Sequence, residues 1–302
     1  MDFSNYIFRS HYMGDLVSVP KPLTDNQTET LLAYRERING VGKQLTEKQK
    51  EDWHSLEYKL SESKKFSLTE TAKNICTNIV FHEKQGRNFK LETKYFDKGL
   101  ETEKQGRDLI SLVTGLKLTS DDERKTNSWV TGKRDIKHDE IIIDNKACFD
   151  FNTFNKHLLE SKHEYYKRQL DNYMELWNIN NSVIAYTLID TPFKIINDEI
   201  RRKDWSKNIL TIEGDVKDEC IDEVVDLVQN HIYTRQGLEE FCQQSSNVRI
   251  EWFINFKEMK PVDRVHFVTH SFDKVRIEQR NECLRLCRDF MNTIKPMNNL
   301  HF

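Results

Sequence analysis

The chain has 302 residues, enough for one large domain or two small ones with a sizeable buried core. Hydrophobic residues make up 37% of it and charged residues 31%, and the presence of 17 Phe and 10 Tyr excludes a disordered chain. The formal net charge of −3 excludes a global attraction to polyanions, so any surface that binds one must come from local clusters among the 46 Lys and Arg residues.

Six cysteines are scattered along the chain without a Cys-x-x-Cys pair, no signal segment opens it, and its longest apolar runs are too short to span a bilayer. These features predict a cytoplasmic protein with free thiols and no membrane partner. Cys283 and Cys287 lie one helical turn apart, which fits half of a metal or iron–sulfur site. Because no second pair stands at a matching spacing, we interpret them as buried small apolar residues.

Residues 5–20 mix apolar and turn-forming residues around Arg9, Ser10 and His11. We expect a strand or loop that packs on the domain. The alternative is that these side chains line the entrance to a phosphate site, in which Arg9 and Ser10 would bind substrate.

A helical hairpin is expected next, with helices over residues 29–38 and 46–63 separated by the break Gly40-Val41-Gly42. Thr24-Asp25 is the helix-start signal before the first helix, and Thr46 with Glu47 opens the second. A third helix follows over residues 67–80, so that residues 25–90 form an N-terminal helical insertion. The hairpin is either a solvated insertion or an arm that grips a partner.

A further helix is expected around Gly99 and Glu103, with Leu100, Ile110 and Val113 on its apolar face. A glutamate beside an apolar helix face is usually solvated. The elements that follow also offer carboxylates, which makes Glu103 a candidate third acidic ligand for a metal ion.

The segment that follows contains a predicted strand that ends in charged side chains. Ile141 to Ile143 form a β-branched run typical of a strand buried on both faces, and Asp144 and Lys146 come directly after it. Residues two apart on a strand point to the same side, so Asp144 and Lys146 share a face.

Residues 128–131 are predicted as a short strand that runs into a turn at Gly132. We expect this turn to bring Asp135 beside Asp144, as in a hairpin. Two carboxylates and the ammonium of Lys146 at the end of a sheet predict a divalent-metal site with a charge-stabilising or activating lysine.

Downstream, an aromatic-rich loop precedes one long helix over residues 156–177, in which Gln169 and Tyr173 are four residues apart and lie on one face. Residues 182–189 form a second β-type run. Further helices are expected at about 193–205, 217–230, 234–244 and 273–294, and strands at 209–212, 248–253 and 262–269. No repeat or Pro/Gly-rich linker interrupts the chain, which favours a single domain over residues 1–302, with a core at 95–205 that residues 206–302 complete.

Four elements in this order resemble the PD-(D/E)xK nuclease superfamily, and most closely its lambda-exonuclease/YqaJ-like viral recombinase branch, which is related to RecB-type nuclease domains. They are Gly-x-x-x-Glu on a helix, Gly-x-x-Asp, Asp-x-Lys on a strand and Gln-x-x-x-Tyr on a helix, found here at Gly99 and Glu103, Gly132 and Asp135, Asp144 and Lys146, and Gln169 and Tyr173. Asp-x-Lys alone is a weak signal, so the order and separation of all four carry the resemblance. It implies an α/β fold with a central mixed β-sheet flanked by helices, a restriction-endonuclease-like core.

The resemblance implies a Mg²⁺-dependent deoxyribonuclease, with Mn²⁺ able to substitute, that degrades duplex DNA from its ends in phage-type recombination or repair inside a bacterial or phage-infected cell. It assigns Asp135 and Asp144 as metal ligands together with the backbone carbonyl of Asn145. Glu103 would complete the ligand shell directly or through water.

In the same resemblance Lys146 would orient the attacking water or act as its general base. A base needs a lowered pKa, which nearby carboxylates oppose, so we favour the orienting and charge-stabilising role. Gln169 and Tyr173 would position the active-site side chains or the DNA backbone. For Tyr173, packing of the helix on the sheet is an equal alternative.

Two positions depart from the family pattern. Arg134 stands where the family often has proline, and the second acidic residue is Asp144 rather than the commoner glutamate. Arg134 either contacts a substrate phosphate or faces away from the metal ligands.

Proteins of this branch work beside a single-strand annealing protein, and some form trimeric rings. The resemblance therefore implies double-stranded DNA as substrate, such a partner and a homo-oligomer, with the hairpin as a DNA clamp or a contact between protomers. Two groups of basic residues either contact phosphates or form solvated faces, and we favour solvated faces for both. They are Arg201-Arg202-Lys203 and, on the last helix, Arg276, Arg280, Arg285 and Arg288.

Two rival functions stand beside the exonuclease. One is an endonuclease of the same fold that cuts branched or specific DNA. The other is a non-catalytic scaffold that binds nucleic acid or protein, whose mark would be the loss of the acidic or lysine residues, and these are all present. An iron–sulfur nuclease is disfavoured by the cysteine spacing.

Overall fold

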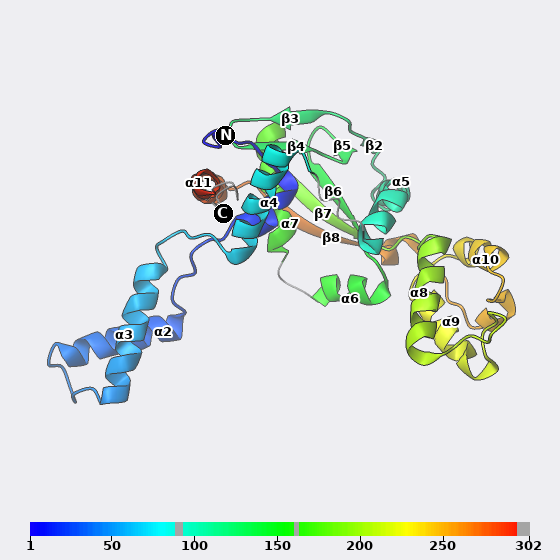
Figure 1. The fold of residues 1–302 in the computed structure, drawn as a ribbon, viewed down its shortest axis with the longest axis horizontal. Helices are drawn as coiled ribbons and strands as arrows, with labels where there is room; N and C mark the ends of the chain where they lie inside the picture. The colour runs from blue at the N-terminus through cyan, green and yellow to red at the C-terminus, as the bar shows by residue number, and fades with distance from the viewer. Residues whose placement is uncertain (88–92, 160–162, 295–302) are drawn as a thin grey trace, which may run out of the picture. The chain divides into compact units, whose positions relative to one another are not determined.

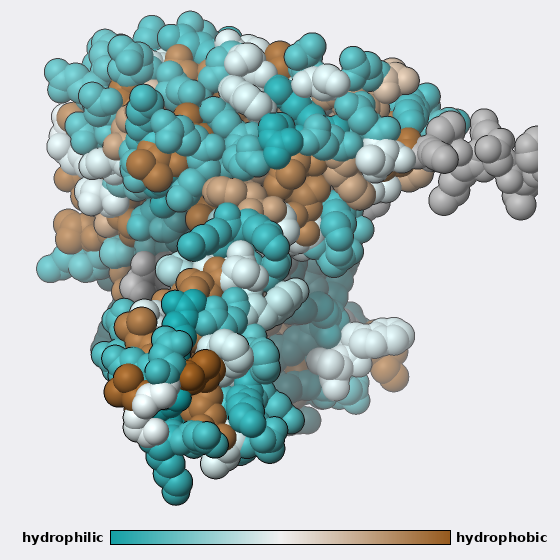
Figure 2. Space-filling view, turned by 90° about the vertical axis from the view of Figure 1, so that its left-hand side faces the viewer, coloured by the Kyte–Doolittle hydropathy of each residue, from teal (hydrophilic) through white to brown (hydrophobic). Residues whose placement is uncertain are grey.

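The computed structural model describes residues 1–87, 93–159 and 163–294. The chain divides into two compact units, one formed by Met1–Arg87 with Lys274–Phe302 and the other by Asn88–Asp273 (Figure 1). The face drawn in Figure 2 is mainly hydrophilic, with hydrophobic side chains in small scattered groups. Within the described ranges no helix combines the length and the apolarity that crossing a membrane requires.

The first unit is helical and contains both ends of the chain. Its elements are β1 (Phe8–Arg9), the 3-10 helix η1 (Ser10–Tyr12), α1 (Met13–Leu16), α2 (Asp25–Ile38), α3 (Glu47–Glu62), α4 (Glu70–Gln85) and α11 (Lys274–Thr293). Thr24, Thr46 and Thr69 accept hydrogen bonds from backbone N–H groups in the first turns of α2, α3 and α4, which fixes where these helices begin.

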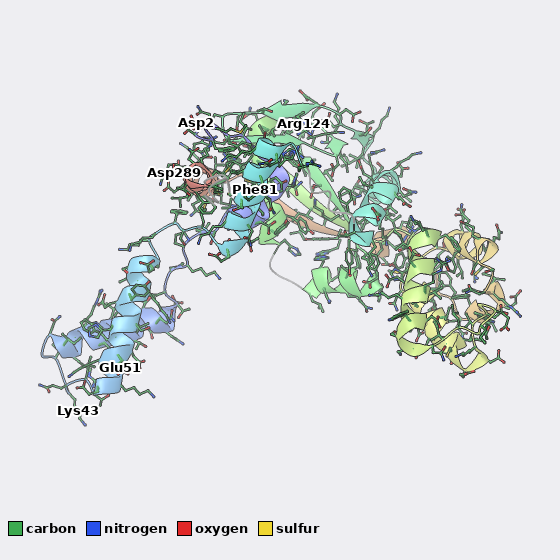
Figure 3. The ribbon with its side chains drawn as sticks, in the orientation of Figure 1. Asp2, Lys43, Glu51, Phe81, Arg124 and Asp289 are labelled. Carbon is green, nitrogen blue, oxygen red and sulfur yellow. The ribbon has the colours of Figure 1, made fainter. Side chains whose placement is uncertain are left out.

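Helices α2 and α3 form the predicted hairpin. Figure 3 labels Lys43 in its loop and Glu51 on α3. Few apolar side chains hold it together, and an ion pair of 2.6 Å between Arg35 and Glu57 joins the two helices. Because its surface is mostly charged and exposed, the hairpin draws little of its stability from a hydrophobic core.

Helices α4 and α11 pack together and bury their cysteines. Cys76 of α4 and Cys283 and Cys287 of α11 are each at most 1% exposed, which confirms the interpretation of the last two as buried small residues. On α11, Arg280 and Arg288 are also buried, so the prediction of a solvated basic face is wrong for these two.

The second unit is built on a three-stranded mixed sheet. Strand β6 (Ile142–Ala147) pairs in parallel with β7 (Asn181–Thr187), which pairs antiparallel with β8 (Val265–Ser271), in the order β6-β7-β8. This confirms the predicted α/β fold with a central mixed sheet and an N-terminal helical part. In this order β6 is an edge strand, and no further strand of this sheet that the structure describes pairs with its outer side. Side chains from both faces of the sheet can therefore approach one another around this edge.

Helices cover the two faces of the sheet (Figure 1). Helix α5 (Lys94–Thr114) places Ile110 against Ile143 and Ala185. Helix α7 (Glu164–Trp177) places Leu170 and other side chains against Ile142, Ile184 and Tyr186. Because strand residues alternate between faces, Asp144 and Lys146 lie on the α7 face and Asn145 on the α5 face.

The strand pairing around Gly132 differs from the predicted hairpin. Strand β4 (Val130–Lys133) pairs with β3 (Arg124–Thr126), and β5 (Ile136–Lys137) pairs with β2 (Thr119–Ser120), instead of β4 pairing with β6. For β4 the partner β3 is closer along the chain than β6, so closing that loop costs less entropy.

The predicted long helix over residues 156–177 is two helices, α6 (Phe151–Leu159) and α7. The aromatic loop before it is therefore partly helical. His163 precedes α7 outside helical geometry, and its Nδ1 lies 2.9 Å from the hydroxyl of Tyr186 on β7. This contact ties the start of α7 to the sheet, which a periodicity argument cannot detect.

A small helical cluster completes the second unit. It contains α8 (Phe193–Lys207), α9 (Ile221–Gln229), α10 (Arg235–Gln244) and the 3-10 helices η2 (Asp218–Cys220), η3 (Ile250–Phe253) and η4 (Pro261–Arg264). The strand predicted at 248–253 is wrong, because Val248 and Phe253 are buried in this helical core with η3. The strand predicted at 209–212 is only a single bridge between Leu210 and Val216.

Candidate active site

Asp144 and Lys146 of β6 form an ion pair on the face predicted for them. Their Oδ2 and Nζ atoms are 2.8 Å apart, and Asp144 is 1% exposed. The other carboxylate oxygen, Oδ1, is also buried and has no hydrogen-bond partner in the described part of the chain. A buried anionic oxygen without a donor is costly, so the site favours a further cation beside Asp144.

Helix α7 holds Lys146 from the other side. Gln169 Oε1 lies 3.4 Å from Lys146 Nζ, and the ring of Tyr166 lies 4.9 Å from the same ammonium. Burial alone would lower the pKa of Lys146, but attraction to Asp144 and Asp135 outweighs it and raises the pKa above its ordinary value. Lys146 is therefore a fixed positive charge in this arrangement.

Gln169 and Tyr173 are linked as the four-residue spacing predicts. Gln169 Nε2 donates a hydrogen bond of 2.8 Å to the Tyr173 hydroxyl, and both side chains are buried. Burial raises the pKa of Tyr173, so its hydroxyl stays protonated. Because the Gln169 amide nitrogen is committed to Tyr173, its carbonyl oxygen must face Lys146. Tyr173 thus has a positioning contact as well as a packing role.

Asp135 lies between β4 and β5, and the charges of this site act on it. Burial, the Asp144 carboxylate and, to a lesser degree, Glu103 raise the pKa of Asp135 to about 7, and Lys146 opposes them. The charges of Asp144 and Lys146 therefore act on Asp135 although β4 does not pair with β6. The repulsion between the two aspartates is what a cation bound between them would relieve.

Helix α5 approaches β6 closely at Gly106. A Cβ atom on Gly106 would lie 2.2 Å from Asn145 Nδ2, and the Asn145 Oδ1 accepts a hydrogen bond of 2.8 Å from Thr187 Oγ1. This contact sets the distance between the sheet edge and the helix that carries Glu103. Leu100 of the same helix is 59% exposed, so the predicted apolar face is wrong at that position, and the buried side includes Lys98 and Thr102 instead.

Among the described residues no three His, Cys, Asp or Glu side chains are close enough together to hold a metal ion between them. Asp135 and Asp144 still fit a divalent cation, because both are oxygen ligands and Asp144 Oδ1 is buried without a donor. With no third acidic side chain of the described residues grouped with these two, Glu103 would contact a bound metal ion through water, one of the two alternatives that the resemblance implies. The role of the Asn145 carbonyl stays a prediction.

Two of the three residues predicted to bind substrate, Arg134 and Ser10, are buried. Arg134 is 4% exposed; its Nε pairs with Asp121 Oδ2 at 2.5 Å and its Nη1 donates to the His138 carbonyl, so it is directed away from a bound phosphate. Ser10, in the first unit, is 2% exposed and is not presented to a substrate. Arg9 is exposed, and its substrate contact stays a prediction.

Two residues that act on this site were not among those predicted from the sequence. Tyr166 precedes Gln169 by three residues and Tyr173 by seven, so helical spacing alone places it on the same face. Arg124 of β3, labelled in Figure 3, is exposed, and its charge acts on the Tyr173 hydroxyl. No sequence signal marks Arg124, because its position depends on the pairing of β3 with β4.

One cavity of the second unit is lined by other residues than these. It has a volume of about 700 Å³ and is bordered by α5 and α10, with Glu101, Asp108 and Glu240 among its lining. Acidic side chains repel phosphate, so this cavity does not suit the backbone of a nucleic acid.

No protein-family model matches the sequence, and no curated protein is significantly similar to it. Among solved structures, a phage-related exonuclease from Haemophilus somnus 129PT superimposes with a TM-score of 0.57 and 18% sequence identity, over 95% of this chain and 94% of that chain. An alkaline exonuclease from Laribacter hongkongensis gives a TM-score of 0.44 and 9% identity over 75% of this chain and 82% of its own. The chain thus has the fold of the phage-related exonuclease, in agreement with its resemblance to the lambda-exonuclease-like branch of the PD-(D/E)xK superfamily.

Proposed function

We propose that this protein is a Mg²⁺-dependent DNA exonuclease that hydrolyses phosphodiester bonds from the ends of duplex DNA. The observation that carries the proposal is the Lys146 ammonium, held between Asp144 and Gln169 at the edge of a mixed sheet with Asp135 beside it. The fold shared with a phage-related exonuclease over nearly the whole length of both chains supports it.

Asp135 and Asp144 would hold the metal, with Glu103 acting through water. Mg²⁺ prefers such oxygen ligands, and when bound it supplies an activated water and offsets the charge of the scissile phosphate. Mn²⁺ would substitute because it accepts the same ligands. The buried and unpartnered Asp144 Oδ1 is the atom that most favours a cation at this place.

Lys146 then acts as a positioned cation rather than as a base. Its ammonium is ion-paired with Asp144 and directs one donor toward Gln169, so it can still donate to a phosphate oxygen or the attacking water. Negative charge grows on the phosphoryl oxygens in the transition state, and a fixed donor stabilises it without reorganisation. Gln169, oriented by Tyr173, restricts where the ammonium can point.

A role in phage-type recombination or repair, beside a single-strand annealing protein and within a homo-oligomer, is part of this proposal. It is supported by the likeness to the phage-related exonuclease alone. Size-exclusion chromatography with light scattering tests the oligomer directly.

Activity is tested on end-labelled linear duplex DNA with and without Mg²⁺ or Mn²⁺, using the wild type, Lys146→Ala and Asp144→Ala. We expect metal-dependent digestion that each substitution lowers by a factor of about a hundred or more. Lys137→Ala, which removes an exposed lysine of β5, is the matched control and should digest normally. Equal digestion by all variants would locate the active site elsewhere.

Covalently closed circular duplex separates the exonuclease from an endonuclease of the same fold. An exonuclease leaves intact circles untouched and degrades them after a nick or a cut, whereas an endonuclease converts them to linear products. DNA binding without hydrolysis of any substrate would favour the non-catalytic scaffold.

A further inference from the structure

Helix α8 carries an exposed tryptophan beside two arginines. Trp205 is 94% exposed, and Arg201 and Arg202, which lie four and three residues before it, each keep 71% of their side-chain surface exposed. Residues at these spacings are neighbours on a helix surface. A large aromatic side chain left in water is costly, so a tryptophan exposed to this degree suggests a surface that contacts a ligand.

The exposed charges of α8 are mainly positive, although the chain as a whole carries −3. Its exposed charged residues are Lys194, Arg201, Arg202 and Lys207 against Asp198, and of these Lys207 is paired with Glu223 at 2.9 Å. Arg201 lies only loosely against Asp198, at 3.8 Å, and Arg202 shares Glu199 with Lys94. This face therefore has a surplus of positive charge, which attracts a polyanion.

A small groove borders the same helix at Arg201. It has a volume of about 230 Å³, below the range of pockets for drug-sized ligands, and suits a group as small as one base or phosphate. Its lining includes Phe193, Asn197, Arg201, Gln244, Ser246 and Asn247. Among the described residues that line it there is no carboxylate, whereas amides, hydroxyls and an arginine are the groups that hydrogen-bond bases and phosphates.

We propose that this surface, the outer face of α8 with the groove at Arg201, binds single-stranded DNA. Trp205 stacks on a base, Arg201 and Arg202 contact phosphates, and the groove accepts a neighbouring nucleotide. An indole stacks on the face of a base, which is open in a single strand and covered by the neighbouring pairs inside a duplex. The inference rests on the proposed function, because an exonuclease that digests one strand of a duplex leaves the other strand single.

The test measures binding of a fluorescein-labelled oligothymidylate of about 16 nucleotides by anisotropy, in EDTA so that no hydrolysis occurs. Trp205→Ala should weaken binding by about 5- to 100-fold, and Trp205→Phe should restore most of it because a stacking ring remains. Arg201→Gln should weaken binding and lower the slope of log affinity against log salt by about 0.7. Intrinsic tryptophan fluorescence should fall on oligonucleotide addition in the wild type and much less in Trp205→Ala.

Ile212→Ala is the matched control, because it removes another fully exposed apolar side chain of the same unit that has no ring to stack. It should bind the oligonucleotide as the wild type does. If Trp205→Ala also binds like the wild type, the inference is wrong and the tryptophan belongs to a protein contact. Digestion of linear duplex is measured in parallel, so loss of the nuclease proposal and loss of this binding surface give separate results.

Discussion

The side chain of Asn145 occupies the space directly over the Cα of Gly106, so that a Cβ atom there would lie 2.2 Å from its amide nitrogen. One residue thus sets how close α5 comes to the edge of the sheet. The hydrogen bond from Thr187 to Asn145 Oδ1 restrains the amide and keeps it from moving aside. Glu103 lies one helical turn from Gly106, so this contact also sets the reach of that carboxylate.

We predict that Gly106→Ala forces α5 away from β6. The new methyl group would overlap the Asn145 side chain, and the hydrogen bond from Thr187 keeps that side chain in place. The free energy of unfolding, measured with urea, should fall by about 1–3 kcal/mol, and the digestion rate should fall with it. Gly99→Ala is the control on the same helix: its Cβ meets nothing within 4 Å, and alanine should stabilise the helix by up to about 1 kcal/mol. Equal effects of the two substitutions would contradict this account.

Gln169→Leu should lower the rate of digestion by about 10- to 100-fold with little change in DNA affinity, because it releases Lys146 without removing a phosphate contact. Tyr173→Phe removes only the hydroxyl that orients Gln169 and should have a smaller effect in the same direction. A double-mutant cycle on the rate measures their coupling. If the two losses simply add, Tyr173 does not act through Gln169.

We predict that the buried Arg134 contributes to stability, whereas the exposed Arg124 contributes to DNA binding. Burial would raise the pKa of Asp121, but the hydrogen bonds from Arg134 and from the Glu123 backbone, with the charge of Arg134, together keep the pKa below its ordinary value. Arg134→Met leaves Asp121 buried without its partner and should lower the free energy of unfolding by about 3–5 kcal/mol.

Arg124→Gln is the companion variant, measured by duplex binding in EDTA at several salt concentrations. It should leave stability unchanged and lower the salt slope by about 0.9, as expected for one lost phosphate contact. At a temperature where Arg134→Met is folded, its DNA affinity should equal that of the wild type. If Arg134→Met lowered the salt slope instead, Arg134 would contact a phosphate, which is the alternative that the sequence left open.

Lys98 of α5 should give stability a pH dependence above neutrality. It is 1% exposed and donates to the Phe149 carbonyl at 2.9 Å and to Thr191 Oγ1 at 2.7 Å, and burial lowers its pKa from 10.5 to about 7. Between these two values the unfolded chain binds the proton and the folded chain does not, so folding becomes more favourable as pH rises from about 7 to 10.5.

Urea unfolding of the wild type and Lys98→Met across this range tests the prediction. The free energy of unfolding of the wild type should rise relative to that of the variant by up to about 1.4 kcal/mol per pH unit. Burial lowers the pKa of the neighbouring His231 to about 4, so this histidine does not titrate in the window. Parallel curves for the two proteins would show that Lys98 has an ordinary pKa.

Local signals in the sequence predicted the elements with strong local causes. The threonine caps of α2, α3 and α4 and the β-branched run of β6 determine their structure largely through residues close along the chain. The shared face of Asp144 and Lys146 also follows from strand geometry alone, and the spacing of Gln169 and Tyr173 from helix geometry.

Features that depend on distant partners were not predictable in this way. Arg134 is buried because Asp121 lies opposite it, and Lys98 is buried because two loops at the ends of β6 and β7 supply acceptors. Neither partner is marked by a periodic pattern. The same holds for Arg124, whose charge acts on Tyr173 because β3 pairs with β4.

The pairing of α4 with α11 has a consequence for how the chain is made. The ribosome makes α4 before the second unit and α11 after it, so the first unit is completed only once the second has been synthesised. The second unit is contiguous and can fold while synthesis continues. Until α11 emerges, Cys76 and Val80 lack part of their cover, and the nascent protein offers chaperones an apolar surface that the finished molecule hides.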